Sequence, residues 1–185
     1  MSAPRLMTDR LMLRGHLPED LDACVELWQN PAVIQYTTGQ PLARQDIWSR
    51  LLRHVGHWDL LGYGYWLAFE QASGRFVGEV GLARFKRTLL EGHPDLDPLP
   101  EAGWVLMPWA HGLGYAREAM TAVLNWHDQE QRAAESFCII DPQNAPSLRL
   151  AAALGYRPRF SVPQEEPRWT VLFRPRTDAE ASTLV

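Results

Sequence analysis

Residues 101–119 read EAGWVLMPWAHGLGYAREA, and this stretch decides the fold. Its apolar residues predict a strand over 102–107 that stops at Pro108, and an apolar stripe at helical spacing predicts a helix from Tyr115 to Gln131. Between strand and helix lies His111-Gly112-Leu113-Gly114. Glycines at this point let backbone N–H groups crowd together at the positive end of the helix dipole, so we expect the loop to bind an anion.

The residues around this loop separate the classes of phosphate ligand. A dinucleotide fingerprint needs a third glycine where this chain has Arg117, and a P-loop needs Lys then Ser or Thr where it has Leu113 and Gly114. The remaining interpretation is a short glycine cradle in which a pyrophosphate is held and not transferred. A tight strand-to-helix turn without a ligand is the alternative for so short a motif.

Working outward, the remaining segments alternate between strand and helix patterns. We expect strands over 6–14, 63–70, 76–85, 136–140, 160–162 and 169–173, helices over 18–30, 43–58 and 146–154, and a long polar loop over 86–100. This order predicts a three-layer α/β fold, a mixed splayed β-sheet with helices on both faces. Only the unit formed by strand 101–107, its helix and strand 136–140 is expected to be a parallel crossover. We predict one domain over 1–185, with a core over about 6–174 and a tail over 175–185.

Composition narrows the classes of protein. With 46% hydrophobic and 22% charged residues in 185, the chain is a folded globular one. The balance of 18 basic against 22 acidic residues is −4, which argues against a nucleic-acid partner and favours a cationic one.

Cys24 and Cys138 are too few for a disulfide framework and should be buried, as in a cytoplasmic protein. No apolar stretch approaches a membrane span, and residues 1–14 lack the apolar run of a secretion signal, so no membrane partner is expected.

Five segments give a more specific signal. In order along the chain they are FVGEVGL (76–82), EAGWVLMP (101–108), GLGYAREA (112–119), PQNAPS (142–147) and LGY (154–156). This ordered set resembles the GNAT acetyltransferase superfamily, most closely its ribosomal-protein N-terminal acetyltransferase branch, the RimJ/RimL type. The opening TDRLMLR (8–14) and PED (18–20) also resemble the start of that branch, and the resemblance spans roughly residues 6 to 174.

The resemblance implies an N-acetyltransferase that moves an acetyl group from acetyl-CoA, its co-substrate, to a primary amine by direct attack in a ternary complex. Strand 101–107 would carry a bulge near its end. The residues implied in acetyl-CoA binding are Val105, Leu106 and Met107 for the pantetheine arm, His111, Gly112, Leu113, Gly114, Tyr115 and Ala116 for the pyrophosphate, and Asn144 near the pantetheine. The sequence supports a helix N-cap at Asn144 equally well, and the two roles can coexist.

A general base is useful because an amine must lose its proton before it attacks. The candidates are Glu79 and Glu101 on neighbouring strands. Glu101 begins its strand and matches the acid that the family places there, whereas Glu79 lies mid-strand, where burial could raise its pKa. For either, an ion pair with Arg84 or Arg117 is the alternative. A backbone N–H near Leu106 or Met107 would stabilise the oxyanion.

The leaving thiolate needs less help than the amine. Many superfamily members place a tyrosine acid at the position held here by Ala151. Ser147 is therefore the candidate proton donor by position, with Tyr156 as a weaker option. His54 and His57 share a helix face without a third ligand, so we predict no metal and expect both side chains to be exposed.

The acceptor amine is left open between a protein N-terminus, an aminoglycoside and a small amine. We expect Glu79, Glu101 and the acids Glu91, Asp95 and Asp97 to surround it and to attract an ammonium group. An acetyl-CoA-binding module without turnover is the main rival, and a nucleotide-binding regulator is disfavoured by Arg117 and the acidic charge. A homodimer is a further possibility.

Overall fold

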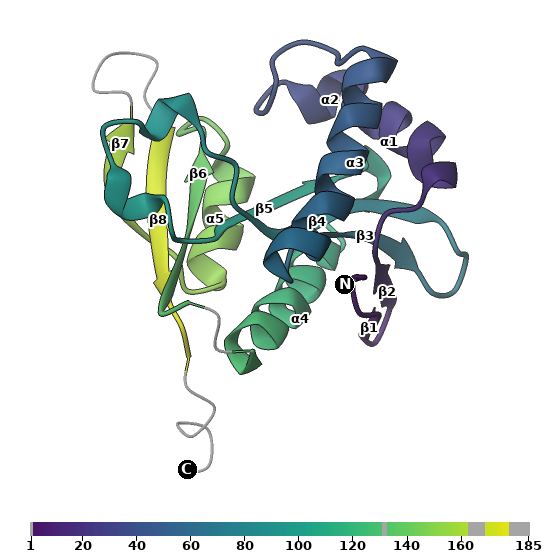
Figure 1. Ribbon diagram of the computed structural model, residues 1–185. Coiled ribbons are helices and arrows are strands. Elements are labelled where there is room, and N and C mark those ends of the chain that lie inside the picture. The colour runs from purple at the N-terminus through teal and green to yellow at the C-terminus, as the bar shows by residue number, and fades with distance from the viewer. Residues whose placement is uncertain (1, 131–132, 163–168, 178–185) are drawn as a thin grey trace.

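An eight-stranded mixed sheet runs through the molecule in the order β1-β2-β3-β4-β5-β6-β8-β7 (Figure 1). The structure is a computed structural model that describes residues 2–130, 133–162 and 169–177. Most of the predicted tail, residues 178–185, lies outside the described part. The predicted three-layer α/β fold is confirmed.

The elements follow the predicted order closely. The strands are β1 Leu6–Met7, β2 Leu11–Arg14, β3 Tyr65–Glu70, β4 Phe76–Ala83, β5 Glu101–Leu106, β6 Glu135–Ile140, β7 Arg157–Val162 and β8 Trp169–Pro175. The helices are α1 Leu21–Trp28, α2 Pro31–Ile34, α3 Arg44–Leu61, α4 Tyr115–Gln129 and α5 Ala145–Ala153. Short 3₁₀ helices are η1 Pro18–Asp20, η2 Thr88–Leu90, η3 Pro94–Leu96 and η4 Pro108–Ala110.

Two local differences have simple causes. The predicted strand 6–14 is a hairpin, because the chain turns where Thr8 N–H donates to the Leu11 carbonyl at 2.9 Å. The short helix α2 was not predicted. Asn30-Pro31, expected to close a helix, begins one instead, since the Asn30 side chain accepts from Ala32 N–H and Pro31 suits the first helical position.

The parallel crossover β5–α4–β6 is confirmed, and it opens the sheet. The strands β5 and β6 pair only at Glu101 and Phe137, after which they separate. The β4–β5 ladder, by contrast, keeps one register from Ala83–Glu101 to Gly78–Leu106. The bulge expected near the end of β5 is therefore absent from this ladder. The register shift lies instead between β3 and β4, where pairing passes from Ala68–Gly78 to Phe69–Phe76.

Helices cover both faces of the sheet (Figure 1). On one face α4 and α5 bury Met120, Val123 and Ala151 in one apolar cluster with the sheet. On the other, α1 and α3 bury Leu27 and Leu51 against Leu67 of β3. The segment 84–100 packs Leu96 into a third cluster with residues of β6, β7 and β8. Among the described residues, no helix is both long and apolar enough to span a membrane.

Candidate active site

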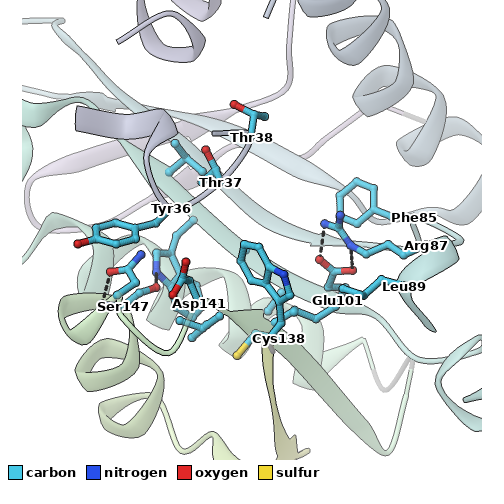
Figure 2. Close-up of a pocket in the computed structure, with 18 of the residues that line it drawn as sticks. Tyr36, Thr37, Thr38, Phe85, Arg87, Leu89, Glu101, Cys138, Asp141 and Ser147 are labelled. Atoms are coloured by element: carbon cyan, nitrogen blue, oxygen red, sulfur yellow. Dashed lines mark hydrogen bonds and ion pairs between the residues drawn. The ribbon is translucent and has the colours of Figure 1, made fainter. Parts of the chain in front are cut away.

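A cavity of about 330 Å³ lies where β5 and β6 separate, in the size range of small-molecule sites. Its walls come from β5, β6 and α5 on one side, and from α1, α3 and the segments after α2 and β4 on the other. Figure 2 shows Glu101 and Arg87 facing each other at one side of the pocket, with Ser147 and Asp141 at the other and Tyr36, Thr37 and Thr38 above. The separation of the strands thus gives one pocket access to groups from both faces of the sheet.

The glycine loop before α4 has the geometry of an anion cradle. Gly112 and Gly114 have φ of 74° and 81°, a left-handed conformation that side chains disfavour. Gly114 is the N-cap of α4 and provides no side-chain cap, so the first N–H groups of the helix remain free for a ligand. Arg10 supports the loop, donating to the Leu113 carbonyl at 2.9 Å and to Glu118 at 2.7 Å.

The loop is also tied to the end of β5, because His111 Nε2 lies 3.0 Å from the Leu106 carbonyl oxygen. His111, Gly112, Leu113 and Gly114 are exposed. Of the predicted cradle residues, 111–114 therefore lie on the surface beside the strand that lines the pocket, while Tyr115 at the start of α4 is buried.

The backbone of β5 presents alternate residues to the opening. Met107 N–H donates to the Val77 carbonyl of the β4 side at 2.8 Å, while Phe137 N–H of β6 donates to the Pro100 carbonyl at 3.1 Å. Since ladder groups alternate, odd-numbered residues direct their N–H and C=O groups toward β4 and even-numbered ones toward β6. The N–H of Leu106 thus faces the opening. The backbone groups of Val105 and Met107 have other partners: Val105 pairs with Glu79 of β4, Met107 N–H donates to Val77, and the Met107 carbonyl accepts from Ala110 N–H at 2.9 Å.

Three residues connect β5 with the start of α5. Asn144 is the N-cap of α5, and its Oδ1 accepts from Ser147 N–H at 3.2 Å. Trp104 Nε1–H donates to Ser147 Oγ at 2.9 Å, so the Ser147 hydroxyl hydrogen can be directed elsewhere. Within the described residues the Asn144 amide nitrogen makes no hydrogen bond, and both Asn144 and Ser147 line the pocket.

Glu101 lies at the opposite wall. Arg87 Nε and Nη2 donate to its two carboxylate oxygens, each at 2.6 Å. Beside it, Tyr65 reaches over β5, because a Cβ on Gly103 would lie only 2.0 Å from the Tyr65 hydroxyl oxygen. Burial raises the pKa of Tyr65, so this hydroxyl stays protonated. The site therefore places an oriented carboxylate and a phenol on the α3 side of the opening.

Glu79 does not line the pocket and is 1% exposed. Its Oε2 accepts from Trp28 Nε1 at 3.1 Å and from Arg50 Nε at 3.3 Å. Burial alone would raise the pKa of Glu79, but Arg50, followed by His16, outweighs it and holds the pKa well below the ordinary value. The expected raised pKa is wrong. An enclosed carboxylate of low pKa is a poor base, which argues against Glu79 as the general base.

The predicted ion-pair partners are also wrong. Arg84 pairs with Asp97 at 3.7 Å, and exposed Arg117 pairs with neither glutamate. The reason is the path of the segment after β4, which carries Arg87 rather than Arg84 to the start of β5.

Two other residues are more buried than expected. His54 is fully buried and stacks on Tyr65 and His16 with ring centroids 4.7 and 4.8 Å apart. Burial, then the charge of Arg50, lowers the pKa of His54 well below its ordinary value. His57 is half-buried. The spacing of Leu51, His54 and Trp58 on the buried face of α3 was the overlooked signal.

His16, His54 and Glu79 bring ligand atoms within 4.8 Å of one another. Arg50 already lies beside the Glu79 carboxylate and supplies a positive charge there. The cluster is therefore explained as the surroundings of the Arg50–Glu79 ion pair.

Tyr156 lies outside the pocket and cannot serve as the acid. It is fully buried, its hydroxyl lies 2.8 Å from Ser136 Oγ, and burial raises its pKa. Cys24 and Cys138 are buried free thiols, as predicted.

The acids of the 86–100 segment lie elsewhere than expected. Glu91 and Asp97 line a second cavity, and Asp97 pairs with Lys86 and Arg84. Asp95 is exposed and lines neither cavity. None of these three acids lines the active pocket itself, and their attraction for the acceptor stays a prediction. Within the described residues, the carboxylates that line the active pocket are Glu101 and Asp141.

Sequence reasoning missed several pocket residues: Trp28, Tyr36, Arg50, Tyr65, Arg87 and Trp104. All except Trp104 come from helices α1 and α3, strand β3 and the segments after α2 and β4, at positions outside the quoted motifs. Only Trp104 stood in a quoted motif, and its partner Ser147 could not be inferred from spacing.

Comparison with known proteins decides the family. Residues 10–157 match the model of the acetyltransferase (GNAT) domain. The chain belongs to the GNAT acetyltransferase family. YkkB of Bacillus subtilis (strain 168) is 29% identical over 159 residues, which are 82% of this chain and 84% of YkkB. A Bordetella pertussis protein described as a GnaT-family acetyltransferase superimposes with a TM-score of 0.81 at 30% identity, covering 92% and 99% of the two chains.

The ribosomal L7/L12 α-N-protein acetyltransferase RimL shares the GNAT fold, with a TM-score of 0.75 at 12% identity over 94% of each chain. Acetyl transfer to amines from acetyl-CoA is the general activity of this family.

Proposed function

We propose that this protein is an acetyl-CoA-dependent N-acetyltransferase that acetylates a primary amine by direct attack in a ternary complex. The observation that carries the proposal is the pocket at the opening between β5 and β6, which contains Glu101 and Ser147 on opposite sides and lies beside the free N-terminus of α4. The RimJ/RimL-like opening of the sequence and the fold shared with RimL favour that branch. Buried free cysteines agree with a cytoplasmic location.

The residues present fit acetyl-CoA. The N–H groups at the start of α4, left without a side-chain cap, would bind the pyrophosphate. The Leu106 N–H and the Asn144 amide face the opening and would bind the pantetheine end. The thioester supplies the acetyl group, and the protein supplies position and proton transfer.

Glu101 is the general base in this scheme. A lysine-like amine with a pKa of about 10.4 is protonated at neutral pH, so its proton must leave before the nitrogen attacks. Arg87 orients the carboxylate with two hydrogen bonds, and each oxygen keeps a further lone pair for the proton, directly or through water. The C–N bond then forms as the C–S bond breaks.

Leu106 and Ser147 stabilise the other charges of the reaction. The Leu106 N–H would donate to the thioester oxygen as negative charge develops on it. Ser147, whose oxygen accepts from Trp104, would give its hydrogen to the leaving sulfur and recover one from solvent. Glu101 and Ser147 thus lie at opposite sides of the pocket. One takes the proton of the amine and the other gives a proton to the leaving sulfur.

A specific observation supports one alternative. Ala151 occupies the position of the superfamily's tyrosine acid and is fully buried, which favours an acetyl-CoA-binding module with weak turnover. Thiol release from acetyl-CoA against a panel of amines separates the two. Acetyl-CoA binding without thiol release for any amine would favour the module, and failure to bind either acetyl-CoA or CoA would overturn both.

Gly112→Asp tests the cradle. A carboxylate against the pyrophosphate should weaken acetyl-CoA binding at least about tenfold in calorimetry. Gly74→Asp is the matched control, because Gly74 has φ of 70°, open space around its Cβ position like Gly112, and lies in the β3–β4 turn. Equal affinity in the two variants would show that the loop is only a turn.

A further inference from the structure

We propose that the acceptor is an amine that also carries an anionic group, and that Arg50 of α3 binds this anion. The inference rests on the proposed acetyl transfer and names its class of acceptor. It starts from one side chain in the pocket wall whose hydrogen-bonding capacity is mostly unused.

Arg50 lines the pocket with a side chain that is 17% exposed. Its Nε donates to Glu79, and its guanidinium carbon lies 3.9 Å above the centre of the Trp28 ring. Among the described residues, the two terminal nitrogens of Arg50 make no hydrogen bond. These donors face the pocket and its solvent, and a bound anion there would replace water with charge-assisted hydrogen bonds.

The guanidinium is also held in place before any substrate arrives. Glu79, which anchors it, is 1% exposed and is itself fixed by the Trp28 indole on the same oxygen. Trp28 therefore restrains Arg50 in two ways. Its ring stacks on the guanidinium, and its indole N–H fixes Glu79, to which Arg50 is bonded. A fork fixed in this way loses little conformational freedom on binding, which is the arrangement that favours planar anions.

The carboxylates on the α3 side of the pocket are already matched by arginines. Glu101 is neutralised by two hydrogen bonds from Arg87, and Glu79 is matched by Arg50. Arg53, one turn along α3, has no acidic partner among the described residues and lies 5.5 Å from the Phe85 ring. Arg53 is exposed and lies outside the pocket lining, so the cations of this wall are Arg50 and Arg87, each matched by one carboxylate. Asp141 is the remaining acid, and Figure 2 shows it across the pocket, near Ser147.

This balance narrows the classes of acceptor. Within the described part of the chain, the α3 side of the pocket has no unmatched carboxylate that could bind the several ammonium groups of a polyamine or an aminoglycoside. A carboxylate or a phosphate matches the fork of Arg50. The fitting acceptors are therefore amines with one acidic group, such as amino acids, acidic N-terminal residues of peptides, or aminoalkyl phosphates.

Matched amines give a direct test. Thiol release is measured for 4-aminobutanoate against n-butylamine, alanine against alaninamide, and phosphoethanolamine against ethanolamine, with spermidine as the polycation. We expect the anionic member of at least one pair to have the higher kcat/KM, and the pair that responds identifies carboxylate or phosphate. The readout is the ratio of kcat/KM, anionic over neutral, compared between variants, so that differences in amine pKa cancel.

Arg50→Gln should lower this ratio by about tenfold or more, because a charge-assisted contact is lost. Arg50→Lys should lower it less, since the charge remains and the fork does not. If Arg50→Gln fails to fold, Arg50→Gln combined with Glu79→Gln removes the charge and its buried partner together. Arg44→Gln is the control, because Arg44 begins the same helix, pairs with exposed Asp22 and lies outside the pocket.

The outcomes separate the two proposals. A ratio that is the same in the wild type and in every Arg50 variant, or a preference for spermidine, overturns the anionic acceptor while leaving acetyl transfer intact. Absence of thiol release with every amine, in a protein that is folded and binds acetyl-CoA, overturns the proposed transferase and this inference with it.

Discussion

Glu79 and Glu101 lie on adjacent strands and face the same side of the sheet, since Glu79 pairs with Val105 and Glu101 is four residues before it. Both are buried, and both carry an arginine partner. Yet Glu79 is enclosed by Trp28, Arg50 and two histidines, whereas Glu101 lines the pocket. The comparison shows that access to the substrate, and not burial or strand position, separates a candidate base from a structural anchor.

The arginines sharpen this contrast. The side chain of Arg87 is 44% exposed, so its pair with Glu101 can rearrange at the pocket edge. That of Arg50 is 17% exposed and stacked on Trp28, so its pair with Glu79 fixes helix α3 to strand β4. The Arg87–Glu101 pair thus lies in the candidate active site, whereas the Arg50–Glu79 pair holds the wall of that site in place.

The largest expected effect is on catalysis at Glu101. Glu101→Gln should lower kcat by roughly 10²- to 10⁴-fold, because the amine loses its proton acceptor, while acetyl-CoA affinity stays within about twofold. Steady-state thiol release and calorimetry measure the two quantities. Glu79→Gln, compared at equal folded fraction, should lose less rate. A greater loss at Glu79 would reverse the assignment of the base.

The next effect is on folding at Glu79. Glu79→Gln leaves Arg50 without its carboxylate and should lower the free energy of unfolding by roughly 3 kcal/mol, as for a broken buried ion pair. Urea denaturation followed by tryptophan fluorescence measures it. Glu26→Gln, an exposed position on α1, should change it by less than about 0.5 kcal/mol. Equal stability of the two variants would contradict an anchoring role.

The smallest effect is the pH dependence of the difference in unfolding free energy between the wild type and Glu79→Gln. The folded state holds the pKa of Glu79 below its ordinary value, so the contribution of Glu79 is present above the unfolded pKa and is lost as pH falls. The stability gap between the wild type and Glu79→Gln should therefore shrink by up to about 1.4 kcal/mol per pH unit below about pH 4.3. Urea titrations between pH 3 and 7 test this. A gap that stays constant down to pH 3 would show that the carboxylate has no lowered pKa.

Most of the architecture was predictable, because it depends on local patterns. The apolar alternation of 101–107, Pro108 and the glycines at 112 and 114 predicted strand, loop and helix within two residues of their observed bounds. Where prediction failed, residues distant in the chain were responsible. The Trp28 and Arg50 bonds to Glu79 span 51 and 29 positions, and no spacing rule reports such contacts.

The sequence by itself determined the order of the main elements, the glycine loop before α4 and the capping role of Asn144. These depend on backbone conformation and on neighbours within a few residues, which composition and spacing describe. Only the tertiary structure decided which carboxylate reaches the pocket, which arginine it meets and that Arg50 lines the pocket while its Nε is bonded to Glu79. Those outcomes depend on how α1, α3 and the 84–100 segment pack against the sheet, and burial among distant groups sets both the pKa and the accessibility of each side chain.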